Sequence, residues 1–236
     1  MSFALTLFFA AAVAAGGPHD DLLVSTQWLA DHLQDSNVVV VEVGGQSAGA
    51  QRIPGARFLP YRAALLDGGL AKWIAEKRPV DVDRFAKRNV VPARFDVNVA
   101  EQRIVTLEEM KQLYNGPSLN GRKVVFVDAR HTDSFTGKQK GNQVSRAGHI
   151  PFAECFPWTA NLTTEKLPVM KPAAQLREMY ASLGITNEVM TVAYCRTGTE
   201  ASLTYFVLRY LGYDVALYDG SYSEWSKQAD TKVAAQ

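Results

Sequence analysis

The sequence predicts an α/β fold in which a mostly parallel sheet is flanked by helices. In the second half of the chain, short strands rich in β-branched residues, such as Val124 to Asp128 and Val189 to Tyr194, alternate with segments of helical periodicity, such as Ala201 to Leu211. This alternation is typical of parallel strands joined by crossover helices. Ligands in such folds bind beyond the carboxyl ends of the strands, so we expect the site in the loops at that edge.

Length and composition agree with a globular protein that does not bind nucleic acid. The 236 residues, 47% of them hydrophobic, suit one or two domains. The formal net charge is +1 and the Lys and Arg residues are scattered, which argues against nucleic acid as a partner. With two Cys and four His at unsuitable spacing, the chain offers no zinc site, and the sequence indicates no metal or other cofactor.

Residues 1–15 are predicted to be a signal peptide. The apolar run from Phe3 to Ala15 is too short to span a bilayer comfortably but has the length of a signal-peptide core, and Ala12 to Ala14 supplies a small-x-small cleavage pattern. The positively charged start of such a peptide is missing, because no Lys or Arg precedes Arg52. We expect a periplasmic or secreted protein whose mature form has no membrane association.

Residues 22–73 repeat the beginning and the end of residues 103–228. Each copy opens on a Ser or Thr positioned to cap an amphipathic helix, which is followed by a Val-rich strand. Two further segments also correspond: Arg52-Ile53-Pro54-Gly55-Ala56 with the segment around His149-Ile150-Pro151, and Leu66–Trp73 with Tyr218–Trp225. The chain is therefore interpreted as a tandem repeat.

The first copy lacks its middle. Only 13 positions separate Pro54 from Asp67, whereas 68 separate Pro151 from Asp219. The missing stretch corresponds to the one that carries Cys195, so the first copy is predicted to be inactive. A unit this small buries little apolar surface, and we expect it to lie against the second copy or to pack poorly. Residues 74–102 are predicted to be a connector, and the residues after Trp225 a frayed polar tail.

Cys195 is the predicted nucleophile. It follows an apolar strand and begins a polar loop, Cys195 to Glu200, that leads into a helix. Backbone N–H groups of such a loop and the positive end of the helix dipole stabilise an anion at the cysteine sulfur, so the thiol is expected to ionise below its usual pKa. Arg196 adds a cation, Gly198 permits a tight turn, and Thr197 and Thr199 offer hydroxyl groups.

Two other interpretations of Cys195 are less favoured. A buried structural thiol is the usual fate of an arbitrary cysteine, but the loop around this one is polar and cationic. A cysteine phosphatase needs an Arg six positions after its Cys to grip phosphate with a bidentate fork, and that position holds Ala201. Phosphate chemistry is therefore not expected.

The loop resembles that of the rhodanese family of sulfurtransferases, which begins Cys-Arg-x-Gly and runs into a helix. Three further stretches match the family and occur in the same order as in the family. They are Val127-Asp128-Ala129-Arg130, Arg146-Ala147-Gly148-His149-Ile150-Pro151 and Tyr218-Asp219-Gly220-Ser221-Tyr222-Ser223-Glu224-Trp225. The resemblance covers about residues 101 to 228. It implies a rhodanese-like catalytic domain at residues 103–228 preceded by a truncated rhodanese-like repeat.

The resemblance implies a thiosulfate sulfurtransferase in which Cys195 carries the sulfur as a persulfide. Thiosulfate would be the donor, and cyanide or a thiol the acceptor. Substrate would be bound by Arg196, Thr197, Gly198 and Thr199, with Arg146 and Arg130 as further cations. Thr197 stands where thiosulfate enzymes commonly carry a cation, and Glu200 adds negative charge, so turnover with thiosulfate is expected to be poor.

Several alternatives stay open at this stage. The donor could be 3-mercaptopyruvate, or the protein could be a persulfide relay that exchanges sulfur with a partner protein, or a degenerate binding module. In an oxidising compartment Cys195 could also pair with Cys155 in a disulfide. For His149 a structural role is expected, and Asp128 and Arg130 are expected to form polar structure at the end of their strand.

Overall fold

The computed structural model describes residues 23–35, 38, 40–42, 57–58, 65–80, 104–119, 121–163 and 168–235. The predicted signal peptide lies outside these residues, as does most of the predicted connector, so both stay predictions, and so does the expected export. Within the described ranges, no helix is long and apolar enough to cross a membrane, and no group of His, Cys, Asp and Glu could hold a metal ion.

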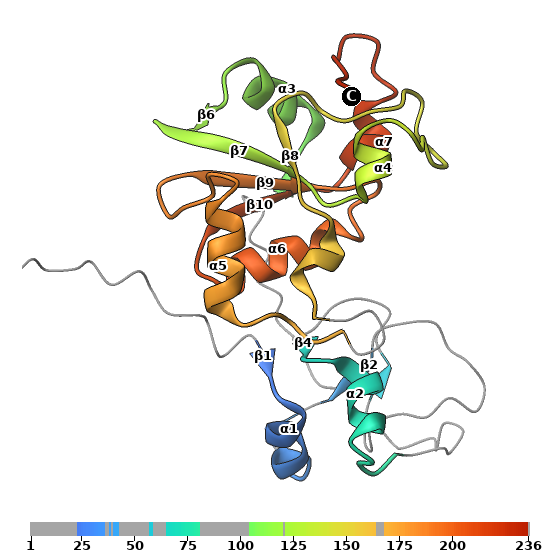
Figure 1. Cartoon of the computed structure of the whole chain (residues 1–236), viewed down its shortest axis with the longest axis vertical. Helices are drawn as coiled ribbons and strands as arrows, with labels where there is room; N and C mark the ends of the chain where they lie inside the picture. Colours follow the sequence, from blue (N-terminus) through green and yellow to red (C-terminus); the bar gives the residue numbers. More distant parts are fainter. Residues whose placement is uncertain are drawn as a thin grey trace, which may run out of the picture.

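A six-stranded sheet forms the centre of the second copy (Figure 1). Its strands are β5 (Ile104–Val105), β6 (Ser118–Leu119), β7 (Arg122–Asp128), β8 (Ala153–Cys155), β9 (Met190–Tyr194) and β10 (Asp214–Tyr218). They are ordered β5-β10-β9-β7-β6, with β8 also paired to β7. Every pair is parallel except the β6–β7 hairpin, which confirms the predicted mostly parallel sheet.

Helices cover both faces of this sheet. One face carries α3 (Leu107–Asn115), α4 (Thr132–Phe135) and α7 (Ser221–Trp225), and the other carries α5 (Ala173–Ala181), α6 (Ala201–Tyr210) and the short 3₁₀ helix η3 (Trp158–Asn161) (Figure 1). A hydrophobic core lies on each face of the sheet, and successive side chains of the central strands point alternately into the two cores. Val192, for example, packs on the α3 side and Ala193 on the α6 side.

The first copy contains β1 (Leu23–Val24), α1 (Thr26–His32), β2 (Val41–Glu42), β3 (Arg57–Phe58), β4 (Leu65–Leu66) and α2 (Gly69–Ala75). Its β1 pairs in parallel with β4, just as β5 pairs with β10 in the second copy. The predicted caps are confirmed: the Ser25 hydroxyl accepts the Trp28 N–H, and Thr106 forms a capping box with Glu109.

Trp73 and Trp225 show the repeat most directly, because they occupy equivalent positions in α2 and α7. Both are fully buried. The indole N–H of Trp73 donates to the Pro79 carbonyl at 2.7 Å, and that of Trp225 to the Lys232 carbonyl at 2.8 Å. The two units therefore share these structural features, and the extent of the truncated repeat stays a prediction.

The first copy contacts the second copy through Asp67. Its carboxylate accepts the Met170 N–H at 2.9 Å. The described core of this copy is small, with Leu29 and Trp73 as its buried members. The expectation that so small a unit lies against the second copy agrees with this contact.

The polar segment after Trp225 is ordered, so the prediction of a frayed tail was wrong. The Arg146 side chain donates to the carbonyls of Trp225, Ser226, Gln228 and Thr231, and the backbones of His149 and Ala234 exchange hydrogen bonds of 2.8 and 3.0 Å. These partners lie about 80 residues away in sequence and leave no mark on local composition.

Gly148 is expected to be intolerant of a side chain. It has φ +110°, and a Cβ atom would collide with the Ala234 carbonyl oxygen. Gly148→Ala should lower the free energy of unfolding by about 2–4 kcal/mol in urea titrations. The control is Gly116→Ala, where an added Cβ meets nothing within 4 Å; equal stability of the two variants would contradict this close packing.

Candidate active site

Cys195 lies directly after β9 at the carboxyl edge of the sheet, as the sequence predicted. The preceding residue, Tyr194, is opposite Asp128 of β7 in the parallel register. The Cys195 side chain is 1% exposed and packs within the core on the α5–α6 side of the sheet. The loop from Cys195 to Glu200 then leads into α6.

The first turn of α7 holds the start of this loop. The Cys195 N–H donates to the Ser221 hydroxyl at 3.2 Å, while the N–H groups of Tyr222 and Ser223 donate to the carbonyls of Cys195 (2.9 Å) and Arg196 (3.0 Å). Ser221 has φ +54°, a left-handed conformation that is uncommon for residues other than glycine and often marks functional sites. The first two carbonyls of the loop are therefore bound on the α7 side.

The amides of the loop remain available. In the described part of the chain, the N–H groups of residues 196–201 donate to no acceptor. Gly198 is buried at φ +86°, and a Cβ there would lie 2.7 Å from an Asp219 carboxylate oxygen. Together with the positive end of the α6 dipole, the free amides form a setting that favours an anion.

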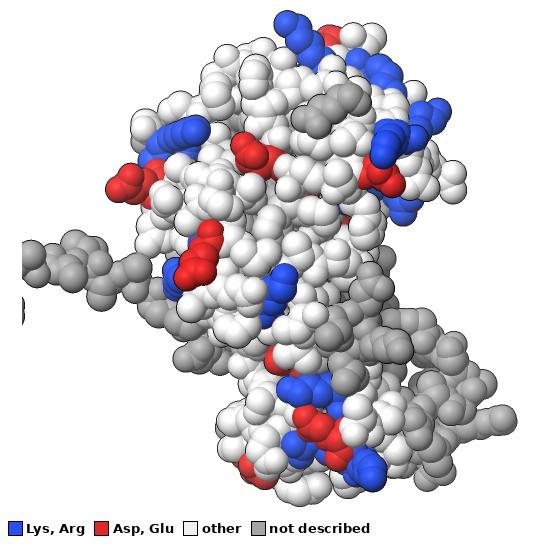
Figure 2. Space-filling view, in the orientation of Figure 1, with Lys and Arg blue, Asp and Glu red and all other residues white. Residues whose placement is uncertain are grey.

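A cavity of about 50 Å³ lies beside the loop. It is lined by Arg130, His131, Ser134, Lys140, Gly141, Val144, Arg196 and Glu200. Arg196 is exposed, as are Thr197 and Thr199, and no described residue forms an ion pair with Arg196. Positive charge from Arg196 and Lys140 thus faces the carboxylate of Glu200. On the face of the molecule in Figure 2, acidic and basic side chains are interspersed.

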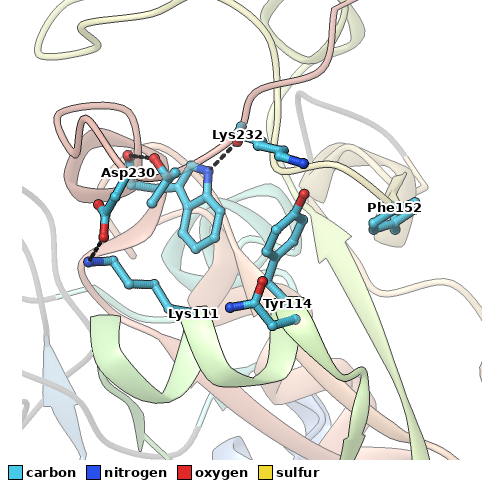
Figure 3. A pocket seen from close by; sticks show the side chains of 8 residues that line it. Lys111, Tyr114, Phe152, Asp230 and Lys232 are labelled. Atoms are coloured by element: carbon cyan, nitrogen blue, oxygen red, sulfur yellow. Dashed lines mark hydrogen bonds and ion pairs between the residues drawn. The ribbon is translucent and has the colours of Figure 1, made fainter.

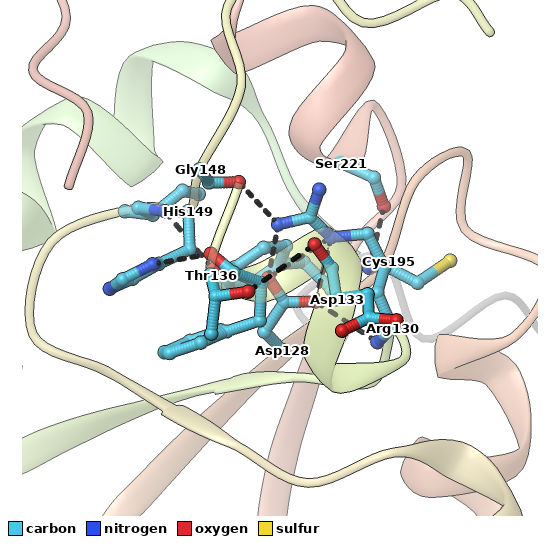
Figure 4. Close-up of polar contacts among 11 residues, drawn as sticks. Asp128, Arg130, Asp133, Thr136, Gly148, His149, Cys195 and Ser221 are labelled. Carbon is cyan, nitrogen blue, oxygen red and sulfur yellow. Dashed lines mark hydrogen bonds and ion pairs between the residues drawn. The ribbon is translucent and has the colours of Figure 1, made fainter. Parts of the chain in front are cut away.

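Arg130 is buried and is bound by protein groups. Its guanidinium bonds both carboxylate oxygens of Asp128, donates to the Gly148 carbonyl at 2.8 Å and lies 4.1 Å from the centre of the Tyr222 ring (Figure 4). Burial opposes its charged form, but the hydrogen bonds and the charge of Asp128 outweigh this and raise the pKa of Arg130. The expected polar structure at this strand end is present.

The structure does not gather all the predicted substrate-binding residues around the thiol. Arg196, Thr197, Gly198 and Thr199 belong to the loop itself, whereas the observed partners of Arg146 are on the C-terminal segment. In Figure 4 the sulfur of Cys195 points away from the Asp128–Arg130 pair. Substrate binding by Arg130 and Arg146 stays a prediction; their observed contacts are with protein.

The two cysteines are free and lie on different sides of β7. Cys155 is opposite Asp128 on β8, and Tyr194 is opposite Asp128 on β9. Neighbouring strands are about 4.8 Å apart, so these positions are separated by about twice that distance, beyond the reach of a disulfide. Cys155 packs against the α3–α7 core and Cys195 within the opposite one. The structure therefore does not contain the Cys155–Cys195 disulfide that the sequence left open.

Sequence reasoning assigned no role to Ser221, Tyr222 or Lys140. Ser221 and Tyr222 belong to the stretch Tyr218–Trp225 that matches the rhodanese family, and the Gly220-Ser221 pair between a strand and a helix is the sequence signal for their role. Nothing local marked Lys140. The structural role expected of His149 is confirmed, since it is buried, stacks on Phe135 and has Nδ1 2.8 Å from the Phe135 carbonyl oxygen.

The chain matches the Rhodanese-like domain family over residues 106–228. Sulfur carrier protein TtuD of Thermus thermophilus is 29% identical, and the alignment covers 93% of this chain and 98% of that protein. The thiosulfate sulfurtransferase of Pseudomonas aeruginosa is 30% identical over 71% of this chain, which spans 58% of that enzyme's length.

Solved structures that are similar to this one include YnjE and the Tum1 protein. YnjE gives a TM-score of 0.76 at 21% identity, covering 92% of this chain and 69% of that chain. The Tum1 protein from Saccharomyces cerevisiae gives 0.72 at 18% identity, covering 91% and 97%. At this identity the likeness concerns the fold. With the family match over more than half of the sequence, the chain belongs to the rhodanese family of sulfurtransferases.

Cys155 should titrate above an ordinary thiol. Half-burial raises its pKa, which a hydrogen bond with Thr132 offsets in part. In Cys195→Ser protein, alkylation of Cys155 by iodoacetamide should therefore stay slow at pH values where free thiols react fast, because only the thiolate reacts. The measurement is the rate against pH with glutathione as control; a midpoint at or below that of glutathione would contradict the prediction.

Proposed function

We propose that the protein moves sulfane sulfur from thiosulfate to cyanide or a thiol acceptor through a persulfide on Cys195. The observation that carries this proposal is the position of the thiol at the start of a loop whose amides, from residue 196 to 201, have no described acceptor. Supporting it are the rhodanese family match and a relative named thiosulfate sulfurtransferase.

The chemistry is a double displacement without an external oxidant or reductant. The Cys195 thiolate attacks the outer sulfur of thiosulfate; a new S–S bond forms as the old one breaks, and sulfite leaves with the electron pair. Cyanide carbon then attacks the terminal sulfur of the persulfide, which forms thiocyanate and returns the thiolate. A thiol acceptor would take the same sulfur as its own persulfide.

Both steps involve anions close to the loop. The free amides and the Arg196 guanidinium supply fixed positive potential for the persulfide and for the leaving sulfite. An Arg directly after the cysteine also favours thiosulfate over 3-mercaptopyruvate, the alternative donor, because mercaptopyruvate enzymes commonly carry Gly at that place. Glu200 at the same cavity opposes this potential and limits turnover.

The second candidate function is a persulfide relay. It is favoured by the similarity, over nearly the whole of both chains, to a protein named sulfur carrier protein. In that function Cys195 would accept sulfur from, or deliver it to, a partner protein. A degenerate module without sulfur transfer is the remaining alternative, and the following experiment separates the three.

Incubation with thiosulfate should add the mass of one sulfur atom to the protein, and cyanide should remove it. The measurement is intact-protein mass spectrometry under non-reducing conditions. Cys155→Ser should load normally and Cys195→Ser should not load, because only Cys195 begins the amide-rich loop. Loading only from a persulfidated protein donor would favour the relay, and no loading from any donor would favour the degenerate module.

Arg196→Gln should lower kcat/KM for thiosulfate by about tenfold, because it removes the exposed cation of the loop. Stability should stay unchanged, since no described residue is ion-paired with this side chain. The matched control is Arg209→Gln, which removes the same charge at the far end of α6. Similar losses in the two variants would show that Arg196 has no specific role.

A further inference from the structure

Phe152 is the most exposed of the large hydrophobic residues that the structure describes. Its side chain is 76% exposed, whereas the next, Ile104, is 45% exposed. Its backbone has φ +67°, in the left-handed region that a bulky residue rarely occupies. The corresponding position of the first copy, in Arg52-Ile53-Pro54-Gly55-Ala56, is Gly55. The second copy thus has an aromatic ring where a glycine would fit the backbone without strain.

The ring of Phe152 continues an aromatic wall. Tyr114 of α3 stacks with Phe152 at a centroid distance of 5.9 Å and meets the Trp225 ring edge-on at 5.5 Å. This wall lines a cavity of about 330 Å³, whose other lining residues are Lys111, Asn115, Asp230, Thr231 and Lys232 (Figure 3). Small-molecule sites in proteins start at roughly this volume.

The two lysines that line the cavity differ in how they are paired. Lys111 forms ion pairs with Asp230 at 3.0 Å and with Glu108 at 3.6 Å, so its charge is compensated by carboxylates. Lys232 is exposed and forms no ion pair with any described residue. Figure 3 shows the Lys232 side chain extending toward Tyr114, and Phe152 lies further away. A ligand on the aromatic wall would therefore place a negative group near the Lys232 ammonium, with the Asn115 amide as a further polar contact.

We propose that this cavity is a second binding site, separate from Cys195, for a small planar aromatic carboxylate. The ligand ring lies against Tyr114 and Phe152, behind which the buried Trp225 packs edge-on against Tyr114, and the carboxylate pairs with Lys232. This role explains the positive φ of Phe152, because an exposed aromatic ring at this position extends the contact area over the cavity. The site does not use the sulfur chemistry of the loop, so it stands or falls independently of the proposed function.

The test is isothermal titration calorimetry of the full chain with indole-3-carboxylate and with its uncharged analogue indole-3-carboxamide. The carboxylate should bind saturably and about five- to tenfold more tightly than the amide. Lys232→Gln should abolish this difference. The control Lys123→Gln removes an exposed lysine on β7, outside the cavity, and should retain it, as should Cys195→Ser.

Phe152→Gly provides the second arm. It should weaken both probes about tenfold without lowering the melting temperature, because glycine tolerates the positive φ. Absence of saturable binding by either probe would overturn the proposal. Wild-type affinity in both Phe152→Gly and Lys232→Gln would overturn it as well, since binding would then lie elsewhere.

Discussion

The attachment of the Cys195 loop to the first turn of α7 is the contact on which the site depends. Helix α7 offers N–H donors at its start, and the loop carbonyls of Cys195 and Arg196 occupy two of them. The Ser221 hydroxyl takes the Cys195 N–H. With its first two carbonyls bound on this side, the loop keeps the amides of residues 196–201, which donate to no acceptor among the described residues, for an anion. The chemistry therefore rests on backbone directions that a helix far along the sequence imposes.

Two arginines, the buried Arg130 and the half-buried Arg146, form the scaffold around this contact. Arg130 joins the end of β7 to Gly148 through Asp128, and its guanidinium lies over the Tyr222 ring in α7. Burying such a pair costs desolvation, which the several hydrogen bonds offset. Arg146 similarly binds the segment after α7. Each of these arginines connects segments that are far apart in the sequence. Both also contact α7, the helix that holds the loop: Arg130 at the Tyr222 ring and Arg146 at the Trp225 carbonyl.

The two copies of the repeat share a structural rule although only one carries a nucleophile. In each, a short first strand pairs in parallel with the last strand, and the next helix buries a tryptophan whose indole N–H is satisfied by a carbonyl beyond the helix. Between these ends, the sequence of the first copy lacks the stretch that corresponds to the one carrying Cys195. Its contact with the second copy through Asp67 and Met170 attaches this small unit to a larger core.

The sequence by itself determined the α/β class, the capped helices, the repeat and the position of Cys195, because all of these depend on local periodicity, capping residues or order along the chain. Tertiary structure decided the rest. The partners of Arg130 and Arg146, the ordered segment after Trp225 and the separation of Cys155 from Cys195 on either side of β7 depend on contacts between distant segments. Ser221 shows the division most clearly: its place after a strand was readable, but its hydrogen bond to the Cys195 amide exists only once β9 and β10 lie side by side.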